Sequence, residues 1–317
     1  MIFLGGCGLQ GPFTESQFSQ LNISKSENSG IIAGTTVDSQ EELSRHTVAL
    51  FSRHQNSDTG GDICTGSLLP GNLVLTAAHC IDNIMVVVFS QDFDTAQSSQ
   101  IFPVDKTSVS DFWSSRRDAY KDHGDIALIH FQGLVPEGFT PVKMIRDGSL
   151  LKNGNPVILA GYGVSHVAET PIDERTYPDL VKSVETGKVV CDNPRKLTNC
   201  VQVDMTGDGL LRKTTVTIAD KNFAQSEILL DQTKGTGACH GDSGGPAYIS
   251  VDDSLYLWGV TSRGERDPKN DCSQYAVYTN VLYYRDWIEK TSQMITASVA
   301  RARKVQIIYP RKFNYWQ

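Results

Sequence analysis

The sequence predicts an all-β fold, either a barrel or a sandwich, on three observations. Short runs rich in β-branched and apolar residues recur along the chain, separated by Gly, Pro, Asn or Asp. One convincing helical pattern occurs, at residues 283–294, where Trp287 and Ile288 could pack inward. No repeat period is visible, which argues against a propeller or a solenoid.

The expected strands follow one another through most of the chain. Their runs lie at residues 47–51, 66–77, 85–89, 126–131, 156–161, 214–219, 255–261 and 276–281. With 317 residues the chain is long enough to bury an ordinary apolar core, as about two domains or one large two-part domain.

Composition and charge exclude several classes of function. Hydrophobic residues make up 39% and charged residues 21%, which is typical of a folded chain. The longest purely apolar run, IMVVVF at residues 84–89, is too short to span a bilayer. The net charge is −7, from 29 basic and 36 acidic residues, and such a surface repels nucleic acid. We therefore expect no nucleic-acid partner.

The seven cysteines indicate an oxidising compartment. They are too few for a small disulfide scaffold, and no two of them form a C-x-x-C pair that would indicate a zinc ribbon or a redox site. Three disulfides with one cysteine left over is the interpretation that remains.

Three segments carry residue types that suit nucleophilic catalysis. A histidine follows a strand in LTAAHC (75–80), an aspartate begins an apolar strand in HGDIALI (123–129), and a serine lies in a glycine-rich turn in CHGDSGGP (239–246). A serine hydroxyl needs an imidazole to take its proton, and the imidazole needs a carboxylate to fix its tautomer. Glycines beside the serine allow backbone N–H groups to face a developing oxyanion.

Chain order decides between two folds that use such a serine. The run GDSGG (241–245) also satisfies the G-x-S-x-G pattern of α/β-hydrolases, in which the histidine follows the serine. All seven histidines precede Ser243, so that arrangement cannot be built here. The order His, Asp, Ser is the chymotrypsin-like one.

In these three motifs the chain resembles the trypsin- and chymotrypsin-like serine endopeptidases, over about residues 31–291. The segments CTGSL (64–68) and AVYTNV (276–281) match the family as well. The resemblance implies two packed antiparallel six-stranded β-barrels and a C-terminal helix, with the active site between the barrels.

The resemblance also implies a role for each motif residue. His79 would be the general base, Asp125 its orienting carboxylate and Ser243 the nucleophile. The backbone N–H groups of Gly241 and Ser243 would form the oxyanion hole. The substrate would be a protein or a peptide, and the chemistry needs no metal or organic cofactor. A non-catalytic binding protein with the same fold is the alternative, which the intact triad opposes.

Disulfide pairs follow from the same resemblance. Cys64–Cys80 would hold the loop of the histidine, and Cys239–Cys272 would tie the serine segment to the pocket wall. Cys191 and Cys200 lie in an insertion at residues 164–210 and are expected to pair locally. A family bridge in the next segment is missing, since Phe223 and Leu230 stand near where its cysteines would fall.

The insertion is longer than the loop that relatives usually have, and we expect it beside the active-site cleft. Residues 204–209 resemble the start of a calcium loop, but Thr215 stands where its glutamate would be. A glycine-rich hairpin turn is therefore expected there, and no metal site.

Pocket positions predict an uncharged specificity pocket. Gly237 stands where trypsin-like relatives carry an aspartate at the pocket base, and Ser262, Arg263 and Gly264 replace the usual Ser-Trp-Gly wall. The methyl of Ala276 would narrow the pocket, because relatives usually keep a glycine there. Small or medium apolar side chains are expected at the cleaved position, with acidic residues, bound through Arg263, as the alternative.

Ile31 resembles the mature N-terminus of the family. Its freed ammonium would pair with Asp242 and order the oxyanion hole and the pocket. Because Gly30 precedes it, trypsin-type self-activation is not implied. Another protease would make the cut, or the activation logic is altered.

Both ends of the chain differ from the 31–290 peptidase region, in which we expect barrels at about 31–150 and 151–290. Residues 1–30 contain LGGC, which resembles a bacterial lipobox ending at Cys7. This predicts a bacterial secreted or envelope-attached lipoprotein; a stray thiol in a clipped signal peptide is the alternative.

Residues 291–317 carry five basic and no acidic residues. We expect a solvated tail or a strand at 305–309, with docking on an acidic surface or anionic lipid as the alternative.

Overall fold

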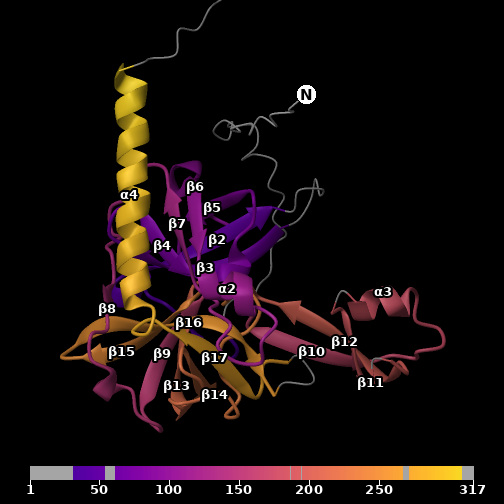
Figure 1. Ribbon diagram of the computed structural model, residues 1–317. Coiled ribbons are helices and arrows are strands. Elements are labelled where there is room, and N and C mark those ends of the chain that lie inside the picture. Colours follow the sequence, from indigo (N-terminus) through magenta and orange to yellow (C-terminus); the bar gives the residue numbers. More distant parts are fainter. Residues whose placement is uncertain (1–30, 54–60, 186, 194, 267–270, 309–317) are drawn as a thin grey trace, which may run out of the picture.

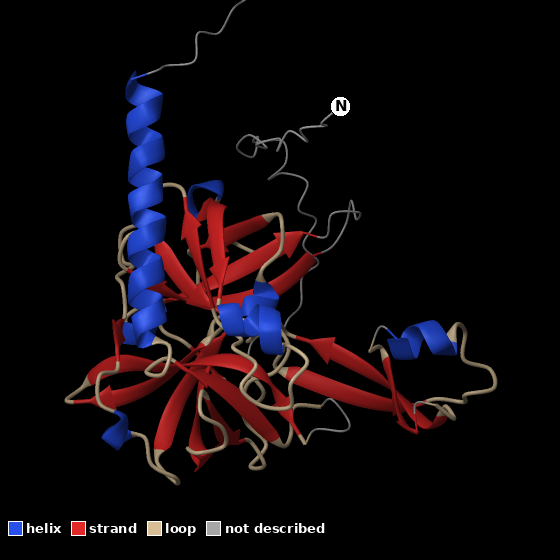
Figure 2. Ribbon diagram, in the orientation of Figure 1, coloured by secondary structure: helices blue, strands red, loops and turns tan. Residues whose placement is uncertain are grey.

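The strands of the protein form two antiparallel barrels, which lie one above the other in Figure 1. The computed structural model describes residues 31–53, 61–185, 187–193, 195–266 and 271–308. Strands dominate these residues and helices are few (Figure 2). The expected all-β fold with two six-stranded barrels and a C-terminal helix is thereby confirmed.

The first barrel closes because β2 pairs with strands on both of its sides. Its strands are β2 (Thr47–Arg53), β3 (Gly61–Leu69), β4 (Leu73–Thr76), β5 (Met85–Val88), β6 (Ile101–Val109) and β7 (Ala127–Phe131). They pair in the order β2-β3-β4-β7-β6-β5, and β5 returns to β2. The run expected as one strand at 66–77 is two strands, because the chain reverses at Gly71 and Asn72, both with positive φ.

The second barrel closes through β9, which pairs with both β13 and β15. Its strands are β9 (Pro156–Gly161), β13 (Arg212–Asp220), β14 (Glu227–Asp231), β15 (Pro246–Val251), β16 (Ser254–Glu265) and β17 (Tyr275–Asn280). Trp258 and Tyr278 are fully buried in its core. Two short strands extend the sheet: β1 (Thr35–Thr36) pairs with β13, and β8 (Lys143–Met144) runs parallel to β16.

Short helical turns connect the strands. They are η1 (Glu42–Arg45), η2 (Ala78–Cys80), η3 (Ser98–Gln100), α2 (Asp111–Arg116) and η4 (Gly148–Leu150). The Ser110 hydroxyl caps α2 by accepting the N–H of Phe112. Of these turns, η2 carries His79, and α2 begins the connection that leads to Asp125.

The insertion forms a small unit that projects from the side of the second barrel (Figure 1). It contains β10 (His166–Pro171), α3 (Leu180–Glu185), β11 (Val189–Asn193) and β12 (Thr198–Thr206), with the strands in the order β10-β12-β11. Leu180 and Val189 pack with the Cys191–Cys200 disulfide in its own small core. The hairpin turn expected at 204–209 is wrong, because β12 pairs with β10 and β11 whereas β13 belongs to the second barrel.

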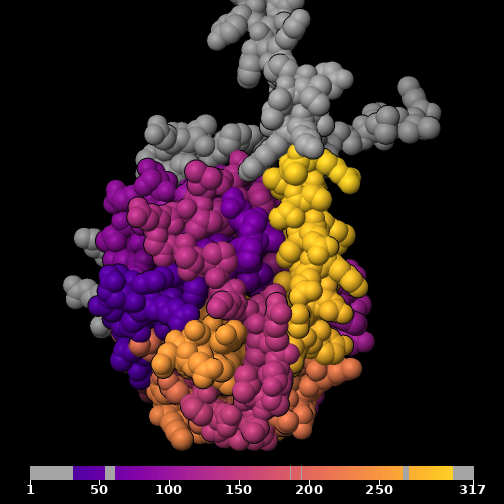
Figure 3. Space-filling view, turned by 90° about the vertical axis from the view of Figure 1, so that its left-hand side faces the viewer, coloured from indigo at the N-terminus to yellow at the C-terminus, as the bar shows by residue number. Residues whose placement is uncertain are grey.

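The C-terminal helix is longer than expected. Helix α4 spans Arg285–Ile308, so the strand expected at 305–309 is wrong for residues 305–308, and residues 309–317 lie outside the described part. Ile288 and Ile295 are buried against the core of the first barrel. Figure 3 shows α4 lying along the flank of both barrels. Across the described residues, no helix has the length and apolar character of a membrane span.

Replacing Ile288 by alanine should lower the free energy of unfolding by about 2–5 kcal/mol, because the substitution leaves a cavity under α4. Ile288 is 1% exposed, whereas Met294 on the same helix is 64% exposed. Met294→Ala is therefore the matched control and should change the free energy by less than about 0.5 kcal/mol. Denaturant unfolding measures both, and equal effects would contradict the described packing of α4.

Candidate active site

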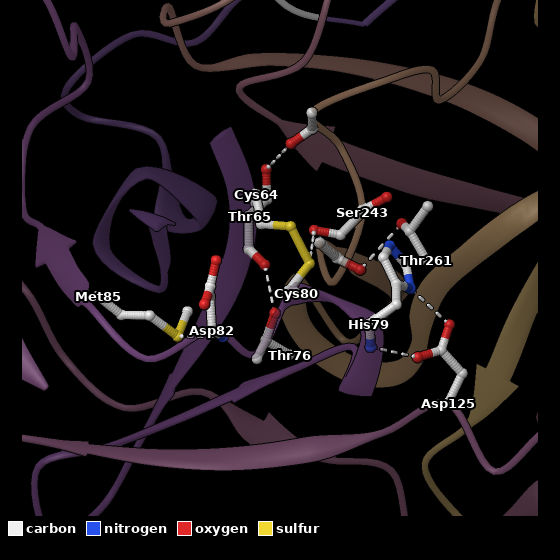
Figure 4. The surroundings of a disulfide bond; sticks show 12 residues. Cys64, Thr65, Thr76, His79, Cys80, Asp82, Met85, Asp125, Ser243 and Thr261 are labelled. Atoms are coloured by element: carbon white, nitrogen blue, oxygen red, sulfur yellow. Dashed lines mark hydrogen bonds and ion pairs between the residues drawn. A yellow bond between two sulfur atoms is a disulfide. The ribbon is translucent and has the colours of Figure 1, made fainter. Parts of the chain in front are cut away.

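The three motif residues come from both barrels and meet between them. His79 lies in η2, directly after β4, and Asp125 lies two residues before β7. Ser243 lies in the turn that precedes β15 of the second barrel. The backbone carbonyl of Ser243 accepts the N–H of Thr65 at 2.8 Å and is 3.5 Å from the sulfur of Cys80. Figure 4 shows Ser243 and His79 beside the Cys64–Cys80 disulfide.

Asp125 is a buried carboxylate that takes part in three hydrogen bonds. Its side chain is 2% exposed. One carboxylate oxygen accepts the backbone N–H of His79 at 3.0 Å; the other is 2.8 Å from His79 Nδ1 and accepts the hydroxyl of Ser262 at 2.6 Å. Burial alone would raise the pKa of Asp125, but the His79 charge and these hydrogen bonds together hold it below its ordinary value.

His79 is held by Asp125 through Nδ1, which leaves Nε2 for another partner. Burial by itself would lower the pKa of the imidazole. The charge and the hydrogen bond of Asp125 outweigh burial and hold the pKa of His79 above its ordinary value of 6.5. A neutral His79 with its proton on Nδ1 is therefore a base whose proton affinity is strengthened by its neighbour.

The serine turn packs tightly against β4 of the first barrel and against the chain that follows β9 of the second, and this packing needs glycine. A Cβ on Gly244 (φ 77°) would come within 2.0 Å of the Thr76 hydroxyl, and one on Gly241 (φ 92°) within 2.7 Å of Gly163 Cα. Thr65 adds a polar link, since its hydroxyl donates to the carbonyl of Gly241 at 3.0 Å. Thr65 lies in the segment CTGSL that matches the family, but the sequence prediction assigned it no role, and only the folded contact shows one.

Backbone N–H groups of the serine turn divide into two kinds. Those of Asp242, Gly244 and Gly245 donate to carbonyls at 2.8–3.0 Å. Among the described residues, no acceptor is recorded for the N–H groups of Gly241 and Ser243. The turn therefore leaves two donors beside the Ser243 side chain.

Asp242 is fully buried and has two backbone partners. Its carboxylate oxygens accept the N–H groups of Gly163 and Cys239, each at 2.8 Å. Burial raises its pKa to about 7, against the lowering effect of these hydrogen bonds. Ile31 is also fully buried, in the core of the second barrel, and Ile32 exchanges backbone hydrogen bonds with Gly237 at 2.9 and 3.3 Å.

The predicted pocket positions lie on three segments of the second barrel. Ser262, Arg263 and Gly264 lie on β16, and Ala276 lies opposite Gly264 on β17. Gly237 lies just before the serine turn, and a Cβ there would come within 2.2 Å of the Gln232 side chain.

Gln232 and Glu227 are two residues of this region that the sequence did not predict. The Gln232 amide donates to the carbonyls of Ala238 and Cys272 and accepts the N–H of Ala238, at 2.7–3.1 Å. Glu227, whose side chain is fully buried, forms a bidentate ion pair with Arg263 at 2.8 and 2.9 Å. No local motif marks either residue, since both act through tertiary contacts.

All three cysteine pairs are disulfide-bonded in the structure. They are Cys64–Cys80, Cys191–Cys200 and Cys239–Cys272. Two clusters in the described residues bring these sulfurs near His79 or His240, but disulfide sulfurs are not thiolate ligands, so neither is a metal site. Cys7 lies outside the described residues.

A buried Asp–His pair facing a serine turn between two β-barrels defines the class of chymotrypsin-like serine endopeptidases. The trypsin family model matches residues 31–288, and the chain belongs to the trypsin family. With its relatives and its fold, this makes the protein a serine endopeptidase, a hydrolase.

Similar proteins include two proteases and one solved structure. A tryptase from Mus musculus is 29% identical over 237 residues, which cover 71% of this chain and 77% of the relative. Chymotrypsin-like elastase family member 1 from Macaca fascicularis is 26% identical over 234 residues, or 72% and 78% of the two chains. The structure of HL collagenase shares the fold, with a TM-score of 0.59 and 21% identity over 83% of this chain and 99% of that chain.

Stability of the uncleaved chain should fall as pH rises, in part because of Asp242. Its folded pKa of about 7 exceeds the ordinary value of 3.8, so its contribution to stability is complete below about pH 4 and is lost as pH rises through about 7. Asp242→Asn should flatten the fall in Tm between about pH 4 and pH 8. Asp147→Asn, at an exposed carboxylate with a lowered pKa, is the control that should keep the fall. An unchanged slope in the Asp242 variant would show that another group titrates.

Proposed function

We propose that the protein hydrolyses peptide bonds through an acyl-enzyme on Ser243, with His79 as general base and Asp125 as its orienting carboxylate. The observation that carries this proposal is the Asp125–His79 hydrogen bond of 2.8 Å, located where Ser243 packs against the residue after His79. Both barrels contribute to this arrangement, so the site exists only in the folded domain.

In the proposed reaction, the Ser243 hydroxyl attacks the carbonyl carbon while His79 takes its proton. The negative charge that develops on the carbonyl oxygen would be stabilised by the N–H groups of Gly241 and Ser243, which have no recorded acceptor among the described residues. His79 then protonates the leaving amine, and water, deprotonated by His79, releases the acyl group. Asp125 stays ionised throughout, as its lowered pKa favours.

We also propose that cleavage before Ile31 activates the enzyme. Asp242 is a buried carboxylate whose recorded partners are two backbone N–H groups, and an ammonium at Ile31 would supply the missing positive charge. The buried position of Ile31 supports this pairing. Cleavage would then remove the pH dependence predicted for Asp242. Since Gly30 precedes the bond, a different protease is the expected activator.

The pocket is proposed to be uncharged and to favour small or medium apolar side chains. Gly237 contributes no charge, and the neutral Gln232 amide fills the space that a side chain at position 237 would take. The positive charge of Arg263 is balanced by Glu227, which argues against a preference for acidic substrates. Ser262 and Gly264 would form the wall, with the Ala276 methyl opposite.

Secretion or attachment to the cell envelope is part of the same proposal. Three disulfides are typical of proteins in an oxidising compartment. Lipidation at Cys7, with membrane attachment through that residue, stays a prediction.

A serine-directed fluorophosphonate should label Ser243 of the activated protein and release its leaving group. Ser243→Ala should abolish the label, and His79→Ala should slow labelling by about 10³-fold or more, because the hydroxyl loses its base. Mass spectrometry of the labelled peptide identifies the site. A folded protein cleaved before Ile31 that takes no label would favour the non-catalytic binding protein instead.

Substrates with Arg or Lys at the cleaved position should be poor for the wild type compared with Ala or Val. Gln232→Ala should enlarge the pocket and raise kcat/KM for a Phe substrate relative to an Ala substrate by about tenfold. Gln274→Ala is the control, since the amide of Gln274 contacts the Ser273 hydroxyl rather than Ala238. Peptide-library cleavage measures these ratios, and efficient cleavage after Arg would overturn the proposed pocket.

A further inference from the structure

The segment that carries Asp125 is held by contacts from the second barrel. Asp122 and Gly124 have positive φ (58° and 70°), so the chain before Asp125 does not follow a strand ladder and needs other partners. The backbone N–H and the hydroxyl of Ser226 both donate to one carboxylate oxygen of Asp122, at 2.6 and 2.7 Å. The backbone N–H of His123 donates to Glu227 at 3.0 Å. Adjacent residues of the second barrel thus hold adjacent residues of this segment.

Glu227 reaches the segment as half of a buried ion pair. Each of its two oxygens accepts one terminal nitrogen of Arg263, at 2.8 and 2.9 Å, and one of them also accepts the His123 N–H. The second terminal nitrogen of Arg263 donates to the carbonyl of Tyr120 at 3.0 Å. The Glu227 side chain is fully buried and that of Arg263 is 20% exposed. The pair therefore contacts the segment at two points, three residues apart.

The same ion pair adjoins the other support of Asp125. Arg263 follows Ser262 on β16, and the Ser262 hydroxyl donates to the Asp125 carboxylate at 2.6 Å. By holding Arg263, Glu227 restrains the strand that presents this hydroxyl. By binding the His123 N–H, it also limits the position of Asp125. The one ion pair thereby supports both the segment that carries Asp125 and the strand whose Ser262 hydroxyl binds the Asp125 carboxylate.

Stability alone is a weak explanation for such a pair. Removing two charges from water costs free energy that their attraction often only balances, and apolar residues of similar volume frequently serve as well. What a bidentate guanidinium–carboxylate pair supplies is defined geometry. Here that geometry is imposed on the segment whose carboxylate must stay within hydrogen-bond distance of His79.

We propose that Glu227 and Arg263 are positioning residues for the reaction, because their ion pair holds the segment of Asp125 and thereby the orientation of His79. This inference rests on the proposed function, in which the Asp125–His79 pair acts on Ser243. Neither side chain touches the reacting atoms. Their effect passes through His123, Tyr120 and Ser262.

Glu227→Gln tests the proposal with little change in shape, since it removes the charge while keeping an oxygen for the His123 N–H. The double variant Glu227→Gln, Arg263→Met removes both charges and leaves no lone charge in the interior. Lys213→Met is the control, because it breaks another half-buried ion pair, with Glu41, that does not contact the Asp125 segment. Each is measured for Tm, for the pKa of His79 by NMR titration, and for the rate at which a small fluorophosphonate labels Ser243.

Both Glu227 variants should label about tenfold more slowly than the wild type. Their His79 pKa should fall toward the ordinary value, because Asp125 is less well aligned. Lys213→Met should change neither quantity. Variants of Glu227 that lose Tm but keep both the wild-type labelling rate and the His79 pKa would overturn the inference. If the wild type takes no label while its His79 pKa still depends on Glu227, the proposed function fails and the positioning role stands.

Discussion

The arrangement of the site depends on one buried carboxylate, that of Asp125. A charge at 2% exposure is tolerable only if donors surround it, and here they come from both barrels. The first barrel supplies the N–H and the imidazole of His79, and the second supplies the hydroxyl of Ser262. The hydroxyl of Thr279 also donates to the Asp125 backbone carbonyl at 2.8 Å. The need to satisfy this carboxylate therefore fixes how the barrels meet, and the serine turn packs at that junction.

A second buried carboxylate, that of Asp242, lies beside the serine, and its pKa is shifted in the opposite direction. Asp125 has charged and hydroxyl partners that hold its pKa low, whereas Asp242 has two backbone N–H groups and a pKa raised to about 7. Two carboxylates of the same chemistry thus have pKa values shifted in opposite directions by their surroundings, which suits the different roles proposed for them. The first is equipped to stay ionised during a reaction. For the second, no positively charged partner is recorded in the part of the chain that the structure describes, which suits the switch proposed for it.

The parts that could be predicted from the sequence are those encoded by neighbouring residues. The histidine, aspartate and serine segments each carry their own context, and the apolar runs predict most barrel strands. Strand β6 was missed because IFPVDKTSV contains a proline and charges and is only half-buried. The end of α4 was missed because the basic residues from Arg301 onward favoured a solvated tail, although Ile295 and Val299 pack against the same core as Ile288. Glu227 could not be predicted as the partner of Arg263, since the two are 36 residues apart and meet only when β14 and β16 fold.

The pocket and the N-terminal segment are coupled by direct contacts. Ile32 pairs with Gly237 through two backbone hydrogen bonds, and the Gln232 amide that fills the space beside Gly237 is fixed to both backbone groups of Ala238. Ala238 is followed by Cys239, whose N–H donates to Asp242. A rearrangement at Ile31 could therefore be transmitted through a few covalent and hydrogen bonds to Gly237 and to the turn of Ser243. In the proposed pocket, Gln232 has no charge to be neutralised, so hydrogen bonding alone would hold the shape of the pocket. Its specificity would then depend on whether residues 237–243 are ordered.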